Sequence, residues 1–238
     1  MVVSRDREFG EIKLVSQGEH ISNNHRILAH RGLWSSPEQQ NTLLALSAAL
    51  EHGFGIETDV RDSAGELVVS HDVPVGGEVK LTQLYSLVQV GSTALPIALN
   101  IKSDGLAKEI SQAFPKEKDA FANTFYFDMS VPQYIHYSRL DLPVAVRLSE
   151  YETVEPLASL MERQHRKWVW LDAFNGDWWL DSEILADASY SYVVVSPELH
   201  GRPHINVWQT VKAAIASGQD VYICTDFPIE FSRYLDAD

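Results

Sequence analysis

The sequence has one cysteine, few cations and no long apolar segment, and each shortage excludes a class of protein. Cys224 has no partner in the chain. This excludes an intramolecular disulfide and leaves a packed core thiol as its simplest role. Lys and Arg number 19 against 33 Asp and Glu, so the net charge is −14. That balance argues against binding to the phosphate backbone of nucleic acids. A small-molecule substrate, with or without a divalent cation, suits the charge better.

Segments that would direct or divide the chain are also missing. No stretch approaches the roughly 18 apolar residues that span a bilayer, and Met1–Glu19 has no apolar run typical of a signal peptide. We therefore predict a cytoplasmic protein without stable membrane insertion, and make no prediction of its oligomeric state. With 238 residues, 45% of them apolar, and no linker or repeat, we expect a single domain over residues 1–238. Residues 1–25 form an extension before the first strand.

Runs of β-branched and aromatic residues alternate along the chain with segments that have helical spacing or helix-start signals. The predicted strands are Arg26–His30, Gly55–Val60, Leu95–Lys102, Thr124–Asp128, Pro143–Ser149, Lys167–Ala173, Ser191–Ser196 and Asp220–Asp226. The predicted helices are Thr42–His52, Val79–Val90, Leu106–Phe114, Val131–Arg139, Val154–Gln164, Trp178–Ala188, Ile205–Ser217 and Ile229–Leu235. Repeated strand–helix units indicate parallel strands, and the economical closure is a (β/α)8 TIM barrel.

A short β-hairpin is expected after the second strand. The strand-like run that ends at His71 follows too soon for a parallel crossover, so it returns antiparallel through a tight polar turn. A pairing of Val60 with Leu67 brings His71 to the level of Ile56 or Glu57. The hairpin thus carries a histidine back to the second strand.

Polar residues near the strand ends share one phase. In an alternating strand Glu57 and Asp59 point the same way, and two carboxylates this close call for a cation. Asn100 and Lys102 lie on the inward face of the next strand of the barrel. Active sites of such barrels are at the carboxyl ends of the strands. Other polar residues of these strand ends are interpreted as pocket lining or interior ion pairs, and they are Asp128, Arg147, Asp172 and Asp226.

An ordered set of motifs resembles the glycerophosphodiester phosphodiesterase family. The motifs are His30-Arg31-Gly32, Asn41-Thr42, Gly55-Ile56-Glu57-Thr58-Asp59-Val60, His71-Asp72 and Thr225-Asp226-Phe227-Pro228. The resemblance implies a TIM barrel that hydrolyses glycerophosphodiesters to an alcohol and glycerol 3-phosphate, with a place in lipid metabolism. By position, it also implies His30 and His71 as acid and base, Glu57 and Asp59 as ligands of Mg²⁺ or Ca²⁺, and Arg31 and Lys102 as phosphate contacts.

The chain departs from the family pattern in two places. Asn100 stands where the family has a glutamate, so the third metal ligand is a neutral amide oxygen, and the site carries less negative charge. Only Val73 to Leu95 separate the hairpin from the next strand. This leaves little room for the cap segment that many relatives carry. We therefore expect an open mouth and a substrate choice of its own.

Several alternatives stay open at this point. The chain is also consistent with a phosphodiesterase for another headgroup or a sugar phosphate, releasing a cyclic phosphate, or with a non-catalytic phospholigand-binding barrel whose metal site is degenerate. Either histidine fits the acid or the base role. Asp72 orients His71 or caps a turn, and Trp178-Trp179 stack on the substrate or pack a helix. The remaining histidines, His200 among them, are interpreted as surface or packing residues.

Overall fold

Eight parallel strands close into a barrel in the computed structural model, which describes residues 23–90, 95–115 and 119–237. The strands are β1 (Ile27–His30), β2 (Gly55–Ser63), β5 (Ile97–Ile101), β6 (Thr124–Phe127), β7 (Ala145–Leu148), β8 (Trp168–Leu171), β9 (Ser191–Val195) and β10 (Val221–Thr225). β1 pairs with β2 on one side and β10 on the other. Between β6 and β7 the described pairing is a single bridge, Tyr126 to Val144, which closes the ring. The predicted barrel is confirmed.

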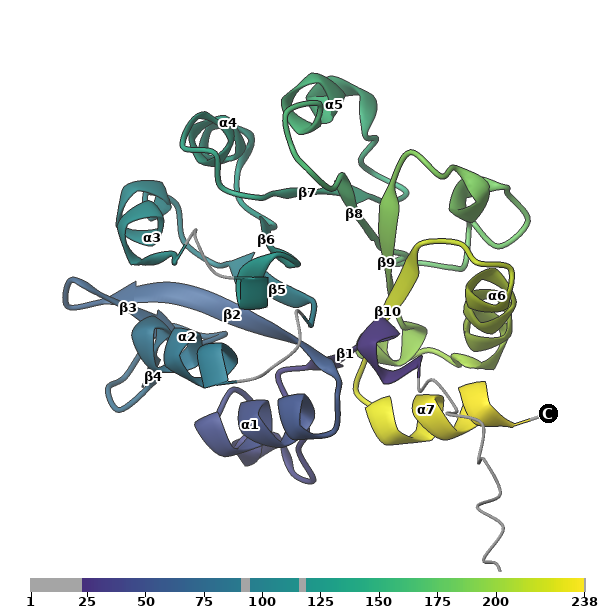
Figure 1. Ribbon diagram of the computed structural model, residues 1–238, viewed down its shortest axis with the longest axis horizontal. Coiled ribbons are helices and arrows are strands. Elements are labelled where there is room, and N and C mark those ends of the chain that lie inside the picture. Colours follow the sequence, from purple (N-terminus) through teal and green to yellow (C-terminus); the bar gives the residue numbers. More distant parts are fainter. Residues whose placement is uncertain (1–22, 91–94, 116–118, 238) are drawn as a thin grey trace, which may run out of the picture.

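Helices surround the strands on the outside of the barrel (Figure 1). They are α1 (Leu43–Glu51), α2 (Leu81–Val90), α3 (Ala107–Ala113), α4 (Val131–Arg139), α5 (Glu155–Met161), α6 (Ile205–Ala216) and α7 (Pro228–Asp236). The Thr42 hydroxyl caps α1 by accepting from the Ala45 N–H. Prolines occupy the first turn of α4, α5 and α7, where a missing N–H costs nothing. Most predicted helices therefore form where the sequence places them.

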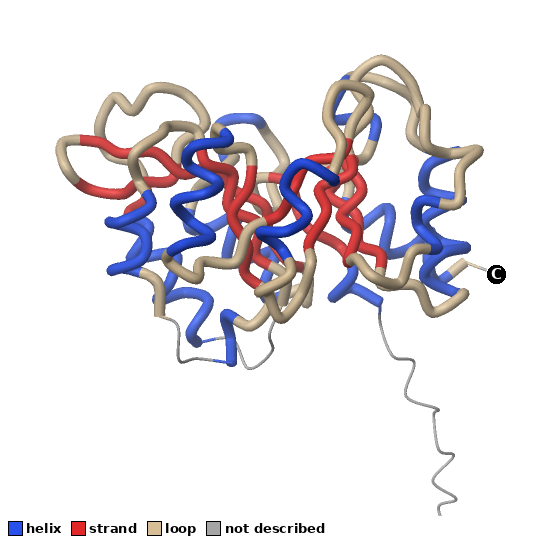
Figure 2. Tube along the Cα trace, turned by 90° about the horizontal axis from the view of Figure 1, so that it is seen from above, coloured by secondary structure: helices blue, strands red, loops and turns tan. Residues whose placement is uncertain are grey.

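The hairpin after β2 is present, but its predicted register is wrong by two residues. β3 (Glu66–Val69) runs antiparallel to β2 and pairs in turn with β4 (Val79–Lys80). The hairpin of β2 and β3 projects from the left side of the molecule in Figure 2. Val60 lies opposite Val69, not Leu67. The turn consists of Ala64 and Gly65 alone, with φ of 50° and 84°. A two-residue turn of this kind fixes the register.

The α-helix predicted over Trp178–Ala188 does not form. This crossover contains turns and one 3₁₀ turn, Ile184–Ala186. The N–H groups of Leu180 and Ser182 donate three residues back, and the Trp178 indole donates to the Asp172 carbonyl at 3.0 Å. Such side-chain bonds to the backbone compete with a continuous helix. The carboxyl-end loop after β8 is consequently long and irregular.

Two apolar layers hold the barrel. The outer faces of the strands pack against the helices, and a separate cluster fills the barrel interior, where Phe127 stacks on Trp170 at 4.0 Å and Phe125 lies 4.7 Å from Trp168. Cys224 belongs to this inner cluster and is fully buried, which confirms its predicted packing role and raises the pKa of its thiol. The interior is thus a packed floor beneath the polar mouth.

Two further findings concern the chain as a whole. The predicted extension over residues 1–25 lies outside the described residues as far as residue 22, and Asn23–Arg26 form a 3₁₀ turn that leads into β1. In the described part of the chain, no helix has the length and apolar character needed to cross a membrane.

Candidate active site

Polar side chains gather above the aromatic floor, at the carboxyl ends of the strands. His30 ends β1, Glu57 and Asp59 lie on β2, and Asn100 lies on β5 directly beside Asp59 in the parallel register. Lys102 follows β5, and its N–H donates to the Val60 carbonyl. The alternation of the strands therefore delivers these residues to one end of the barrel, where TIM-barrel active sites are found.

His30 is held between two carboxylates. Its Nδ1 lies 2.7 Å from Asp226 Oδ1, and its Nε2 lies 3.8 Å from Glu57 Oε2. Burial lowers the pKa of His30, but the hydrogen bond with Asp226 and the charges of Glu57 and Asp226 outweigh that effect and raise it. Because a carboxylate only accepts, Asp226 fixes the proton on Nδ1 and leaves Nε2 directed toward Glu57. His30 thus has a position and a raised pKa that suit an acid–base group.

The backbone after β1 turns sharply so that Arg31 returns over β2. Arg31 and Gly32 adopt φ of 56° and 92°, and the Arg31 N–H donates to the Glu57 carbonyl at 2.9 Å. A Cβ at Gly32 would approach the Ala45 backbone to 2.7 Å, so only glycine fits this turn. The His-Arg-Gly motif therefore has a conformational as well as a chemical basis.

Asp59 organises the cations of the site. Its Oδ2 accepts from Asn41 Nδ2 at 2.9 Å and lies 3.3 Å from Arg31 Nε, while its Oδ1 lies 3.4 Å from Lys102 Nζ. Asn41 is itself oriented by the Thr58 hydroxyl at 2.7 Å. Asp59 is buried, so its charge acts strongly on both cations. Two cations are thereby held side by side, as a phosphate requires.

Two buried oxygens of this cluster lack a hydrogen-bond partner. They are Glu57 Oε2 and Asn100 Oδ1. Such oxygens are available to ligate a metal ion. Burial, reinforced by the charge of Asp59, raises the pKa of Glu57 to about 7, so the site favours added positive charge. Oxygen ligands of this kind suit Mg²⁺ or Ca²⁺. Within the described ranges no three His, Cys, Asp or Glu side chains form a metal-holding group. A fit therefore depends on Asn100 as the third ligand beside the two carboxylates.

His71 lies at the rim rather than in the cluster. The corrected register moves it from the level of Ile56 or Glu57 to that of Thr58, next to Asp59, whose carbonyl accepts from the Ser70 N–H. Its imidazole Nδ1 lies 2.9 Å from Asp72 Oδ1, and 43% of its side chain is exposed. Among the described residues, no hydrogen bond, ion pair or ring contact joins His71 to His30. The structure therefore brings the other predicted residues together and leaves His71 beside them.

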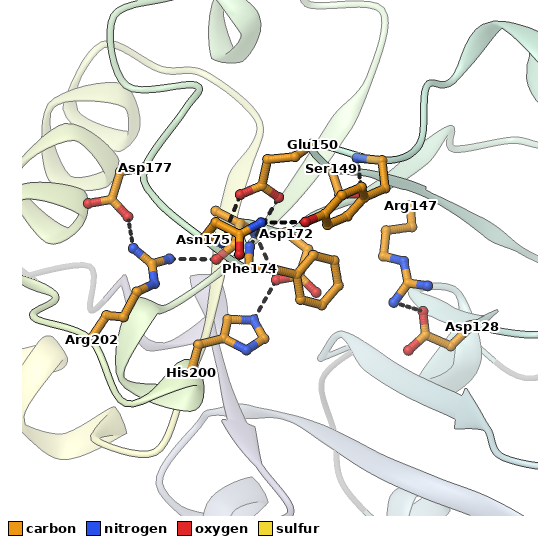
Figure 3. Close-up of polar contacts among 12 residues, drawn as sticks. Asp128, Arg147, Ser149, Glu150, Asp172, Phe174, Asn175, Asp177, His200 and Arg202 are labelled. Carbon is orange, nitrogen blue, oxygen red and sulfur yellow. Dashed lines mark hydrogen bonds and ion pairs between the residues drawn. The ribbon is translucent and has the colours of Figure 1, made fainter.

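A second polar group, drawn in Figure 3, lies at the carboxyl ends of β6 to β9, and Asn100 joins it to the first group by donating from Nδ2 to Asp128 Oδ2 at 3.2 Å. His200 Nε2 lies 2.7 Å from Asp172 Oδ1, and Arg147 pairs with Asp128 at 3.2 Å and with Glu152. Sequence reasoning left Asp172 and Arg147 open and did not select His200. The available signal was position alone, because His200 ends the 3₁₀ turn Pro197–His200 in the loop after β9. Asp128 reaches the mouth through a left-handed backbone, with φ of 65°.

Comparison with known proteins bears on the fold. No protein-family model matches the chain, and no curated protein matches it. Among solved structures, a glycerophosphodiester phosphodiesterase from Agrobacterium tumefaciens is similar, with a TM-score of 0.61, 19% identity and coverage of 89% of this chain and 99% of that one. A mutant tryptophan synthase α-subunit from Pyrococcus furiosus is also similar, with a TM-score of 0.50, 14% identity and coverage of 90% and 95%. At these identities the likeness establishes a TIM-barrel fold.

Proposed function

We propose that this protein is a metal-assisted phosphodiesterase that hydrolyses glycerophosphodiester-like substrates to an alcohol and glycerol 3-phosphate. The observation that carries the proposal is the juxtaposition of His30, a pair of cations and two buried oxygens without a hydrogen-bond partner at the barrel mouth. The similar fold of a solved glycerophosphodiester phosphodiesterase supports it. We place this activity in the cytoplasm and in the turnover of lipid headgroups, as expected from the sequence.

His30 moves the proton in this proposal. Asp226 holds Nδ1–H, so Nε2 is the nitrogen that exchanges a proton with the reacting oxygen. The raised pKa keeps more of the imidazole protonated near neutrality than in a free histidine. We assign His71 as the second acid–base group, because its Nδ1 faces Asp72 and its Nε2 is left for the substrate. The order of the two roles stays open.

Arg31 and Lys102 neutralise the phosphate. Both lie within 3.4 Å of Asp59, which keeps them on one side of the mouth. A guanidinium and an ammonium that flank a phosphate stabilise the charge that grows on its non-bridging oxygens. Glu57, Asp59 and Asn100 would hold Mg²⁺ or Ca²⁺, which supplies further positive charge to the phosphate oxygens when bound.

A non-catalytic phospholigand-binding barrel is the second candidate, and Asn100 is the observation that favours it. An amide in place of a carboxylate leaves the metal site one charge short, as a decayed site would be. A phosphodiesterase for another headgroup or a sugar phosphate is the alternative within the enzyme class. The two classes differ in whether His30 is needed for turnover.

A phosphorus NMR time course tests the proposal. The protein is mixed with several glycerophosphodiesters in EDTA, and Mg²⁺ or Ca²⁺ is then added in excess. We expect metal-dependent loss of a diester resonance and growth of glycerol 3-phosphate or a cyclic ester. If every diester persists, while glycerol 3-phosphate still binds by calorimetry, the binding-only barrel replaces the enzyme. A sugar-phosphate diester is tested in the same way. If it is the only diester converted, the substrate assignment moves to that headgroup.

A further inference from the structure

His200 forms a second imidazole–carboxylate pair at the mouth of the barrel. Like His30 with Asp226, it meets an aspartate oxygen at 2.7 Å, here from Asp172. Asp172 is buried, and the same Oδ1 also accepts from the Ala173 N–H at 2.8 Å. Because that carboxylate accepts, His200 donates from Nε2. A neutral His200 therefore presents Nδ1 as an acceptor, and in the described part of the chain nothing hydrogen-bonds that atom.

The surroundings of His200 form a continuous surface, which we call the β7–β9 wall and define by Arg147, Phe174 and His200. Phe174 lies between the other two in Figure 3, with its ring 5.2 Å from that of His200 and 5.5 Å from the Arg147 guanidinium carbon. Arg147 is committed to Asp128 and Glu152. The Nδ1 of His200 is a polar side-chain atom of this wall to which no described residue hydrogen-bonds, so it is open to a ligand.

Three loops are tied together behind this surface. Glu150, after β7, accepts from the N–H groups of Phe174 and Asn175, after β8, at 3.1 and 3.0 Å. Arg202, after β9, donates to Asp177 and to the Ala173 carbonyl, both at 2.5 Å. A surface fixed in this way loses little conformational freedom when a ligand binds. The wall is therefore a preorganised one.

The position of the wall decides which part of a substrate it meets. The phosphate-binding cations and the two buried oxygens without a hydrogen-bond partner belong to β1, β2 and β5 or to the residues that follow them. In the wall, Arg147 lies on β7, Phe174 follows β8 and His200 follows β9. In the order of the barrel strands, β8 is separated from β2 by three strands on either side, and Asp128 lies between the two groups, accepting from Asn100 at 3.2 Å and pairing with Arg147. For a phosphate held at Arg31 and Lys102, we therefore expect the alcohol half to extend toward the β7–β9 wall.

We infer that His200 is a specificity-determining residue whose Nδ1 accepts a hydrogen bond from a hydroxyl group on the alcohol half of the phosphodiester. The inference rests on the proposed phosphodiesterase function and narrows its substrates to hydroxylated alcohols. An alcohol that ends in a quaternary ammonium has no N–H or O–H to donate. Such an alcohol gains nothing from His200.

Two diesters separate these cases, because glycerophosphoglycerol carries hydroxyls on its alcohol and glycerophosphocholine carries a quaternary ammonium. The variants are His200→Ala and His200→Gln, and the latter keeps an N–H donor for Asp172 if the former misfolds. His136→Gln, at an exposed position of α4, is the matched control. We expect kcat/KM for glycerophosphoglycerol to fall about tenfold in both His200 variants, the size of one neutral hydrogen bond. The kcat/KM for glycerophosphocholine should change less than about twofold, because its choline group makes no such hydrogen bond.

Each other outcome has a definite meaning. An equal fall for both diesters in His200→Gln, with unchanged circular dichroism, assigns His200 a structural role and overturns the inference. No fall for either diester overturns it as well. In both of these cases the wild-type protein still turns over diesters, so the proposed function survives. If the wild-type protein converts neither diester nor any other, the proposed function fails and the inference falls with it.

Discussion

The two ends of the barrel differ in how completely their polar side chains are paired. At the amino end, Asp220 accepts from Arg26 and from Ser191, both at 2.5 Å, and lies 3.3 Å from Arg166. At the carboxyl end, Glu57 Oε2 and Asn100 Oδ1 are buried without a hydrogen-bond partner. An unpaired buried acceptor is costly, whereas a saturated ion pair is not. The Asp220 cluster is thus arranged for stability, whereas the Glu57 and Asn100 oxygens stay open to a ligand.

The contrast extends to the pKa values. Partial burial of Asp220 opposes its ionisation, but hydrogen bonds from Ser191 and Arg26 and the charge of Arg166 outweigh this and lower its pKa. Burial and the charge of Asp59 instead raise the pKa of Glu57 to about 7. One end therefore favours its carboxylate ionised and the other favours it protonated. A carboxyl group whose pKa is shifted by burial and by a neighbouring charge is typical of functional sites.

The largest effect is expected from removing the acid–base group of the carboxyl end. His30→Ala should lower kcat for a glycerophosphodiester by about 10²- to 10⁴-fold, the usual contribution of general acid–base catalysis. Phosphorus NMR gives the rate. His136→Ala, an exposed histidine of α4, should retain full activity. If His30→Ala turned over the diester at the wild-type rate, His30 would take no part in the reaction. The difference in pairing between the two barrel ends would then have no demonstrated role in catalysis.

Adding the missing charge at the carboxyl end should strengthen metal binding. Asn100→Glu restores a third carboxylate beside Glu57 and Asp59, and we expect Mg²⁺ or Ca²⁺ to bind about tenfold more tightly or better. Isothermal titration calorimetry measures the affinity. Asn206→Glu, on the exposed surface of α6, controls for the added charge itself. Unchanged or weaker binding in Asn100→Glu would show that position 100 is not a ligand.

The strands could be predicted because runs of β-branched and aromatic residues identify them, and their alternation then places Glu57, Asp59 and Lys102 on one face. The hairpin register depends on which two residues take positive φ, and the sequence shows glycine at Gly65 but not the matching conformation of Ala64. The loop after β8 has helical spacing, yet its side chains bond to the backbone instead. The local sequence pattern therefore predicts most strands and helices, but it does not predict the hairpin register or the irregular loop after β8.

Contacts between distant segments limited the prediction of the site. His30 meets Asp226 across 196 residues, and His200 meets Asp172 across 28. Strand phase put both aspartates at the mouth, but only the path of the loops selects which histidine each one meets. The hairpin and the resemblance both predict His71 in the site, and the structure places it at the rim. His200, at the end of a 3₁₀ turn after β9, is predicted as a surface or packing residue, and the structure places it at the mouth.

Removing the unfavourable charge of the carboxyl end should change the pH dependence of stability. Folded Glu57 keeps its proton up to about pH 7, whereas the unfolded side chain releases it near 4.5. The native state thus binds more protons between these values, and stability falls as pH rises through them. In metal-free urea unfolding, Glu57→Gln should match the wild-type protein below pH 4.5 and become the more stable of the two above 7. A constant difference across this range would contradict the prediction.

The smallest effect is expected at the amino end, with the opposite sign. Asp220→Asn keeps the shape of the side chain but removes the charge that faces Arg26 and Arg166, at a cost of about 1 to 2 kcal/mol near pH 7. The pKa of folded Asp220 is below the ordinary value of 3.8, so this stability is fully present above that value and is lost as pH falls through the folded pKa. Urea unfolding should therefore show the variant and the wild-type protein converging at low pH, whereas the exposed control Asp119→Asn shows no loss at any pH. If Asp220→Asn also abolished turnover at pH 7, the two ends would be coupled and the separation of stability from chemistry would not hold.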